Sequence, residues 1–442
     1  MNTRIYTFLI ALCAIFFCSC QEKIVDERPI KNNNDVGFLT VIYQNPVIRH
    51  NCPDPSVFDD RARSGYFYAI STQNGTSDTE SVVYMPIYRS KDMVNWELVG
   101  NAFGEDANGV GIRPQWVPDT RIWAPDMEYD EVNNRYCLYY AEGHWDTPSL
   151  SAVGVAVSNS PTGPYTWENI PELNPYANPH GMLVDFRSTG VTNSIDGNLI
   201  RDAETGEKYL FWGSFGAKSG VWAIKLTDDG LAIAPGAEKV QIAYSMEGTY
   251  VHYNPKTRYY YCFGSKGSCC SGKNSTYHIV VGRSENILGP YVGRDGRTML
   301  SSVFDNEKNT IMSNPEGNYF AGTGHNAEII TDDAGQNWMF YHAYWQGNNY
   351  NGRCMNMDQI VWTDDGWPSF TTAHPTELKT MGPKWKKASQ SGGGAVNPDD
   401  STSESTPETE PEEDQDSESE TQKQNCGDCR NTSQWDGATP EE

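Results

Sequence analysis

The 442-residue chain has few basic residues, and its longest apolar run, Tyr6–Phe17, is too short to cross a bilayer as a mature helix. Lys and Arg total 33 against 58 Asp and Glu, which gives a formal net charge of −25. Nucleic-acid binding needs a basic surface, so this balance excludes nucleic acid as a partner. The chain also lacks a phosphate-binding glycine pattern, a Ser-centred nucleophile elbow and a zinc-binding His pair, which excludes the corresponding enzyme classes.

The N-terminus has the pattern of an export signal. Arg4 precedes the apolar run, and Cys18-Ser19-Cys20 follows it as a small-residue cleavage zone. Cys20 stands where a bacterial lipoprotein is cleaved and acylated, although an ordinary signal peptide with an incidental Cys has the same appearance. We therefore predict a lipoprotein signal peptide over 1–20 and a polar tether over 21–36. The protein is then exported to the outer membrane or cell surface, the alternative being a periplasmic or secreted protein.

Residues 388–442 contain almost no apolar side chain. Fifteen Asp and Glu and two basic residues, Lys423 and Arg430, give this segment about half of the chain's net charge of −25. Such a segment cannot bury enough apolar surface to offset its ordering entropy. The composition predicts an acidic, disordered tail, and leaves 37–387 as the folded domain.

The folded domain contains six cysteines, and export permits disulfides. Cys269 and Cys270 are adjacent, so we expect them not to pair with each other. The sequence does not decide how they pair with the remaining four, which are Cys52, Cys137, Cys262 and Cys354.

A repeat of five units runs through 37–387, which is rich in Tyr, Trp, Gly and Asn, as β-proteins are. Each unit opens with an ionisable residue and a β-like stretch, makes a polar turn, and continues into an aromatic strand and a further strand. One unit cannot bury both of its faces, but five arranged radially can. The repeat predicts an all-β, five-bladed β-propeller. The five aromatic strands are Tyr66–Ile70, Tyr136–Tyr140, Tyr209–Trp212, Tyr259–Phe263 and Trp338–His342.

The innermost strand of each propeller blade lines the central channel, so equivalent residues of the five blades face one another. The repeat places Asp54, Asp126, Asp196, Glu247 and His325 at these positions. One or two such residues would merely hydrate a channel, but four acids in register repel one another and indicate a reaction site. Asp126 follows Ala-Pro, which favours a different role for it, as a clamp on backbone N–H groups.

Clustered carboxylates among aromatic side chains are typical of glycosidic bond cleavage. The motifs around them, taken in chain order, resemble those of the family 43 glycoside hydrolases, and within that family those of the arabinanases. The motifs are Cys52-Pro-Asp54-Pro-Ser-Val57, Trp123-Ala-Pro-Asp126, Ser194-Ile-Asp196, Gly213-Ser-Phe215, Glu247-Gly-Thr249, Gly267–Tyr277 with its Ser-Cys-Cys-Ser-Gly run, and Gly322-Thr-Gly-His325-Asn326.

The resemblance implies a five-bladed propeller that hydrolyses with inversion. It implies Asp54 as the general base, Glu247 as the general acid, and Asp196 as the carboxylate that orients the acid and raises its pKa. It also implies His325 beside an axial cation, expected to be Ca²⁺ with a shell mostly of water. Two residues depart from the family pattern, Gly197 and Thr249, where Pro is frequent.

Three further residues are candidates for substrate binding. Trp123 and Phe215 are candidate platforms for furanose rings, the alternative being core packing, and Ser214 is a candidate partner for a sugar hydroxyl. The expected substrate is arabinan or an arabino-oligosaccharide with α-1,5-linked L-arabinofuranose units, cleaved internally by a monomeric enzyme. The alternatives are an exo-acting α-L-arabinofuranosidase or β-xylosidase, and a non-catalytic glycan-binding lipoprotein.

Overall fold

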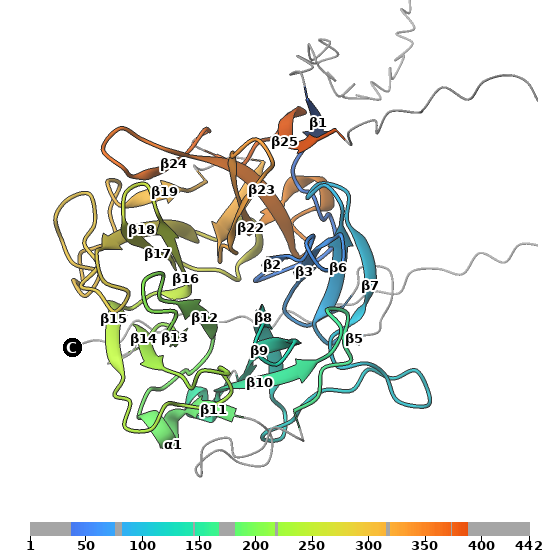
Figure 1. The fold of residues 1–442 in the computed structure, drawn as a ribbon, viewed down its shortest axis with the longest axis vertical. Helices are drawn as coiled ribbons and strands as arrows, with labels where there is room; N and C mark the ends of the chain where they lie inside the picture. Colours follow the sequence, from blue (N-terminus) through green and yellow to red (C-terminus); the bar gives the residue numbers. More distant parts are fainter. Residues whose placement is uncertain are drawn as a thin grey trace, which may run out of the picture. The chain divides into compact units, whose positions relative to one another are not determined.

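The computed structural model describes residues 37–75, 82–144, 146–167, 182–216, 220–314, 319–372 and 374–387. Five antiparallel sheets are arranged around a common centre, with the first strand of each sheet innermost (Figure 1). This is a five-bladed β-propeller, as the repeat predicts. Within the described ranges, no helix is long and apolar enough to cross a membrane.

Each blade is built from one continuous segment of the chain, and in the first blade a separate two-stranded sheet, β4 (Asn74–Gly75) and β5 (Val82–Val83), lies between β3 and β6. The first blade contains β2 (Ser56–Asp59), β3 (Phe67–Ile70), β6 (Pro86–Ser90) and β7 (Glu97–Asn101), and the second β8 (Arg121–Asp130), β9 (Arg135–Gly143), β10 (Ala152–Ser158) and β11 (Met182–Asp185). The third contains β12 (Asn198–Arg201), β13 (Lys208–Trp212), β14 (Gly220–Lys225) and β15 (Val240–Tyr244). The fourth contains β16 (Glu247–Asn254), β17 (Tyr259–Lys266), β18 (His278–Ser284) and β19 (Thr310–Met312). The fifth contains β20 (Phe320–Gly324), β21 (Ile329–Thr331), β22 (Asn337–Trp345), β23 (Arg353–Trp362) and β24 (Pro368–Phe370).

The aromatic strands of the repeat are β3, β9, β13, β17 and β22, the strands next to the innermost ones. Their side chains are almost entirely buried, because each of these strands has a blade on both of its faces. The core is divided into five clusters, each between two neighbouring blades. Ile70 of the first blade, for example, packs in one cluster with Leu138 of the second. Burial of these faces explains why radial packing suits the repeat.

An Asp or Asn at the end of the innermost strand, or directly after it, organises the following turn. Asp202, for example, accepts the backbone N–H groups of Glu204 and Thr205 at 3.0 and 2.8 Å. Asp332 accepts those of Ala334 and Gln336 at 3.0 and 2.8 Å. These side chains satisfy backbone donors that have no partner in the strands, which explains the polar turns of the sequence repeat.

The two ends of the folded domain meet outside the five blades. β1 (Phe38–Tyr43) pairs antiparallel with β25 (Thr380–Lys386), at the rim of the fifth blade in Figure 1. Trp385 of β25 packs against Phe67 of the first blade, with ring centroids 5.4 Å apart. The predicted signal peptide and tether (1–36) and the predicted tail (388–442) lie outside the described residues.

The cysteines correct one expectation. Cys269 and Cys270 form a disulfide with each other, in the loop between β17 and β18. Their Cα atoms are 3.8 Å apart, the ordinary spacing of neighbouring residues and shorter than the usual span of a disulfide. The expectation was wrong because it applied the usual span to residues whose loop can turn locally. Cys52, Cys137, Cys262 and Cys354 are free and buried.

Candidate active site

Three of the predicted axial residues share an unusual backbone conformation. Asp54 (φ 52°), Asp196 (φ 56°) and His325 (φ 46°) all have left-handed backbone, which costs a residue with a side chain about 1–3 kcal/mol. Asp54 and Asp196 each lie two residues before an innermost strand, β2 and β12. This strained turn at the start of the strand places the side chains of different blades at one level of the axis.

Asp126 does not belong to that level. In the second blade the left-handed residue is Ala124 (φ 43°), two residues earlier, so Asp126 corresponds to Ser56 and Asn198 of the neighbouring blades. The predicted register of Asp126 with Asp54 was wrong because β8 begins before the left-handed residue. Asp126 accepts the backbone N–H of Leu199 at 2.7 Å, as a clamp would, but the donor belongs to the next blade.

Asp54 is held ionised by cations. Its Oδ1 is 2.9 Å from Nη1 of Arg353 and 3.2 Å from Nδ1 of His325, and its Oδ2 accepts the Thr72 hydroxyl at 2.6 Å. Burial alone would raise the pKa of Asp54, but Arg353 and His325 together hold that pKa well below its usual range. The backbone N–H of Asp54 donates to Nδ1 of His342 at 3.1 Å. Asp54 is therefore a fixed carboxylate, suited to accept a proton from water.

Glu247 is in the opposite state. In the fourth blade Gly248 (φ 57°) takes the left-handed position within the bulge of β16, so Glu247, at the start of β16, lies one residue before the predicted register with Asp54. Its Oε2 accepts the Ser214 hydroxyl, and its Oε1 accepts the Tyr277 hydroxyl at 2.9 Å. Burial raises the pKa of Glu247 against the opposing effects of these two donors and of the His325 charge, and the Asp54 carboxylate adds to the rise. Glu247 thus retains a proton at higher pH than an exposed Glu.

The pKa of Asp196 is affected by charges of both signs. Asp196 is 7% exposed, and its Oδ2 accepts the backbone N–H of Gly248 at 3.0 Å, directly beside Glu247. Burial raises the pKa of Asp196 to about 7, and the charges of Glu247 and Asp54 raise it while His325 opposes. The structure therefore brings Asp54, Asp196, Glu247 and His325 into one interacting group, as the sequence predicts.

His325 carries the compensating charge. Burial would lower its pKa, but the carboxylates of Asp54, Asp196 and Glu247 raise it to about 9. Its backbone N–H donates to Oγ of Ser265 at 2.8 Å. An imidazolium here neutralises part of the repulsion among the three acids.

His325 also lines a cavity of about 20 Å³ on the axis, together with Asp126, Asp196 and Glu328. This volume suffices for about one water molecule. Thr249 Oγ1 and Asn326 Oδ1 belong to residues that line the same cavity, and neither atom has a hydrogen-bond partner within the described structure. A small polar occupant would satisfy these buried oxygens. No cluster of three or more His, Cys, Asp or Glu among the described residues could hold a metal by itself.

The predicted substrate-binding residues lie in different environments. Trp123 and Phe215 are half-buried, so each keeps some uncovered aromatic surface. The Trp123 ring lies against the backbone of Gly143, where an added Cβ would approach it to 1.6 Å. Ser214 is 1% exposed, and its hydroxyl is engaged by Glu247, which gives it a position behind the acid.

Four residues of the site were missed in the sequence: Thr72, Tyr277, His342 and Arg353. Tyr277 ends the Gly267–Tyr277 motif, and His342 ends the fifth aromatic strand, so both had a local signal. Arg353 begins β23, and only its contact with Asp54, 299 residues away in the chain, reveals its role.

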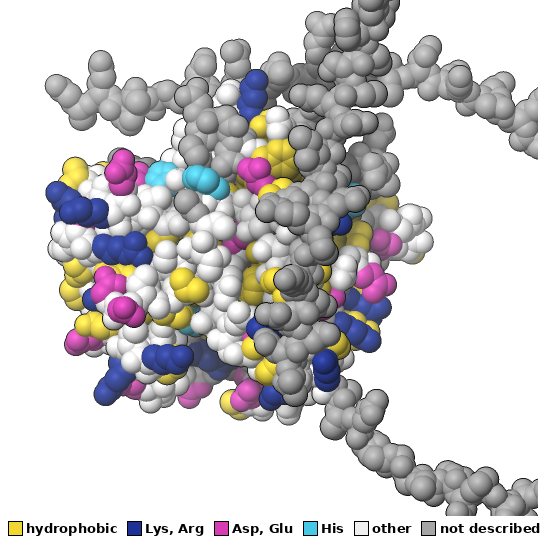
Figure 2. Space-filling view, turned by 90° about the horizontal axis from the view of Figure 1, so that it is seen from above, with side chains coloured by type: hydrophobic (Ala, Val, Ile, Leu, Met, Phe, Trp, Pro, Cys, Tyr) yellow, Lys and Arg dark blue, Asp and Glu magenta, His cyan; other side chains and the backbone are white. Residues whose placement is uncertain are grey.

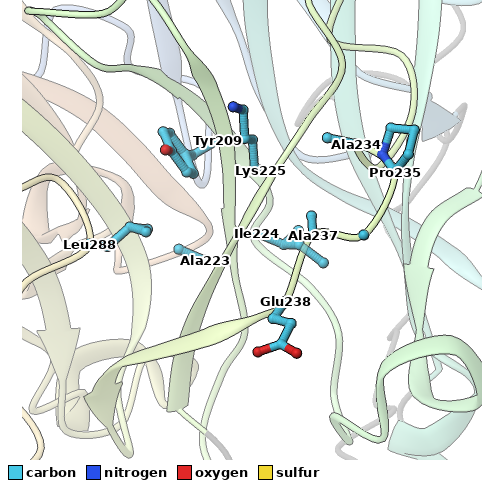
Figure 3. A pocket seen from close by; sticks show the side chains of 10 residues that line it. Tyr209, Ala223, Ile224, Lys225, Ala234, Pro235, Ala237, Glu238 and Leu288 are labelled. Atoms are coloured by element: carbon cyan, nitrogen blue, oxygen red, sulfur yellow. The ribbon is translucent and has the colours of Figure 1, made fainter.

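A larger cavity of about 320 Å³ lies elsewhere, on the third blade (Figure 3). It is lined by Tyr209, Lys225, Glu238 and neighbouring residues, with Leu288 of the fourth blade, and contains none of the axial acids. Lys225 is already paired with Glu207, with 2.5 Å between Nζ and Oε1. Charges of both signs are interspersed on the face shown in Figure 2. The axial group therefore remains the candidate reaction site.

Comparison with known proteins agrees with this site. Residues 43–368 match the model of glycosyl hydrolases family 43. The chain is 30% identical over 334 residues to the arabinan endo-1,5-α-L-arabinosidase C of Emericella nidulans, which covers 72% of this chain and 90% of that protein. It is also 30% identical over 305 residues to the extracellular exo-α-(1→5)-L-arabinofuranosidase ArbA of Cellvibrio japonicus, covering 64% of this chain and 79% of that protein.

Among solved structures, the fold is similar to that of Cellvibrio cellulosa α-L-arabinanase complexed with arabinohexaose. The TM-score is 0.56 at 27% identity, covering 72% of this chain and 95% of that one. The family match spans the five blades and includes every axial acid described above. The chain belongs to glycosyl hydrolases family 43 and is a glycoside hydrolase.

Proposed function

We propose that this enzyme hydrolyses α-1,5-L-arabinofuranosidic bonds within arabinan chains, with inversion of configuration. The observation that carries the proposal is the contrast between Asp54, whose pKa is held well below its usual range, and Glu247, whose pKa is raised, within one interacting group. Both an endo-acting and an exo-acting arabinan-cleaving relative are 30% identical to the chain, so identity supports the linkage more strongly than the mode of attack.

Asp54 serves as the general base in this proposal. An inverting hydrolase activates a water on the face of the sugar opposite the leaving group. Arg353 and His325 keep Asp54 ionised, and Thr72 fixes its second oxygen. The carboxylate thus accepts a proton from the attacking water while its own orientation is preserved.

Glu247 serves as the general acid and protonates the departing glycosidic oxygen. Ser214 and Tyr277 hold its two oxygens, and burial raises its pKa and so favours the protonated form. Asp196 fixes the start of β16 through Gly248 and places a second acidic group beside Glu247. After each turnover the proton gained by Asp54 returns to solvent and Glu247 is reprotonated from it.

The mode of attack is tested by product analysis on linear arabinan. We expect a ladder of oligosaccharides from the wild type, because an endo-acting enzyme cleaves at interior bonds.

Glu247→Gln removes the proton donor but keeps the shape of the side chain, so we expect activity to fall by about 10²–10⁴-fold with an unchanged melting temperature.

Each other product pattern identifies a competing function. A single small product would identify an exo-acting enzyme, and release of xylose from xylo-oligosaccharides but nothing from arabinan would identify a xylosidase. Binding of arabinan without any product would indicate a non-catalytic glycan-binding protein. Activity of Glu247→Gln within tenfold of the wild type would remove Glu247 from the mechanism.

We further propose that a cation, with Ca²⁺ as the expected ion, binds on the channel axis beside His325 with a shell mostly of water, outside the small cavity that holds about one water molecule. The pairing of His325 Nδ1 with Asp54 is the arrangement that orients metal-binding imidazoles elsewhere. A metal binds only the neutral imidazole, so a bound cation would take the place of the imidazolium charge beside the three acids. When bound, the cation would offset repulsion among the carboxylates and favour ionised Asp54.

The cation proposal predicts calcium binding by the wild type in calorimetry, and none by His325→Ala. We expect His325→Ala to lower kcat more than it raises KM, and prolonged chelation of the wild type to reproduce part of that loss. Chelation should leave the rate of His325→Ala unchanged. If wild-type protein binds no calcium and chelators leave its rate untouched, the cation is not part of this enzyme.

For localisation, we propose an exported, membrane-anchored monomer. The support is the N-terminal signal pattern with Cys20, together with relatives that are named extracellular. Cys20→Ala removes the acylation site, so we expect the protein to move from the membrane fraction to the soluble fraction. A variant that stays with the membrane would show that another anchor exists.

A further inference from the structure

The loop between β17 and β18 contains an exposed disulfide, and its last residue, Tyr277, contacts the acid Glu247. Cys269 is half-buried and Cys270 is exposed, and both lie within Gly267–Tyr277. The base of the loop is closed by the backbone N–H groups of Thr276 and Tyr277, which both donate to the Ser268 carbonyl at 3.1 Å. The Ser275 hydroxyl, at 3.3 Å from the Cys269 carbonyl, ties the disulfide to the same base.

Tyr277, the last residue of the loop, contacts the machinery for both reacting groups. It is 1% exposed, and its hydroxyl donates to Oε1 of Glu247 at 2.9 Å. Its ring stacks on His342, with centroids 5.6 Å apart and planes 10° apart. His342 in turn accepts the backbone N–H of Asp54. A displacement of Tyr277 would therefore reach the acid directly and the base through one intermediate residue.

The opposite side of Tyr277 is closed by the fifth blade. An added Cβ on Gly324 of β20 would lie 2.1 Å from Cδ1 of Tyr277, and one on Gly322 would lie 2.5 Å from Cβ of Ser275. The two glycines let β20 pack directly against the base of the loop. Tyr277 is thus fixed by β20 on one side, and its remaining freedom depends on the conformation of the loop.

We propose that the Cys269–Cys270 disulfide is a clip that fixes this loop, and that Tyr277 is a positioning residue that aims the Glu247 carboxyl at the glycosidic oxygen. The ring closed by the disulfide removes backbone freedom from the loop, which would otherwise have to be ordered on folding. Small misplacements of a reacting group cost up to about 10²-fold in rate. The inference rests on the proposed role of Glu247 as the acid.

Tyr277→Phe is the direct test, because it removes the hydroxyl and keeps the stacked ring. On linear arabinan we expect kcat to fall by about tenfold or more, with KM changed by less than about twofold. The same variant is then assayed on a dinitrophenyl glycoside of arabinotriose, whose leaving group departs with little need of a proton. We expect the loss to shrink to within about threefold there, because a misplaced acid no longer limits the rate.

The disulfide is tested by reduction and by substitution. A water-soluble phosphine gives the disulfide two electrons, water supplies two protons and the oxygen, and the products are two thiols and a phosphine oxide. We expect the reduced wild type to lose several-fold in kcat on arabinan and little on the dinitrophenyl substrate. Cys269→Ser/Cys270→Ser should show the same loss without reductant and no further change with it, which controls for every other cysteine.

The outcomes separate this inference from the proposed function. If the double variant and the reduced wild type keep full activity while Glu247→Gln is inactive, the clip is refuted and the acid assignment stands. A loss of equal size on both substrates would show that Tyr277 acts on overall structure and refute its positioning role. If the double variant does not fold, Tyr277→Phe and the reduced wild type, with folding followed by circular dichroism, still decide. An active Glu247→Gln would overturn the proposed function itself.

Discussion

Buried negative charge on the axis is the constraint on which the site depends. Asp54 and Asp196 are each 7% exposed, and Glu247 interacts with both, so three acids share a small region of low polarity. Such a group is stable only if cations compensate it or some of its members keep their protons. The structure uses both solutions: Arg353 and His325 hold Asp54 ionised, whereas burial raises the pKa of Glu247 and so favours its protonated form. The division into base and acid follows from which carboxyl lies beside the cations.

Hydrogen bonds between the innermost strands of neighbouring blades fix the positions of the site residues relative to one another. Asp126 bonds the backbone of the third blade, Glu328 accepts the backbone N–H of Val57 in the first blade at 2.6 Å, and Ser56 accepts that of Met127 in the second at 3.2 Å. The side chains that make these bonds lie further along the innermost strands than the reacting residues. They fix the innermost strands to one another, so the left-handed turns above them carry their side chains to a common place.

The repeat and the axial residues could be predicted because they depend on local patterns, namely the alternation of turns and aromatic strands and an ionisable residue near the start of each unit. Arg353 could not, since its pairing with Asp54 arises only when the fifth blade closes against the first. The register of Asp126 failed by two residues because β8 starts earlier than the equivalent strands, and the position of a left-handed residue has no clear sequence signal outside Gly. The prediction that Cys269 and Cys270 do not pair was wrong because the usual Cα–Cα distance of a disulfide does not apply to adjacent cysteines.

The central claim is that Asp54 activates a water on the face opposite the bond that Glu247 protonates. Proton NMR of the first product formed from an α-1,5-linked arabino-oligosaccharide tests this most directly, because mutarotation is slow enough to follow. The account predicts that the β-anomer of the new reducing end appears first and then equilibrates. Initial appearance of the α-anomer would show retention and would contradict the division of roles between Asp54 and Glu247.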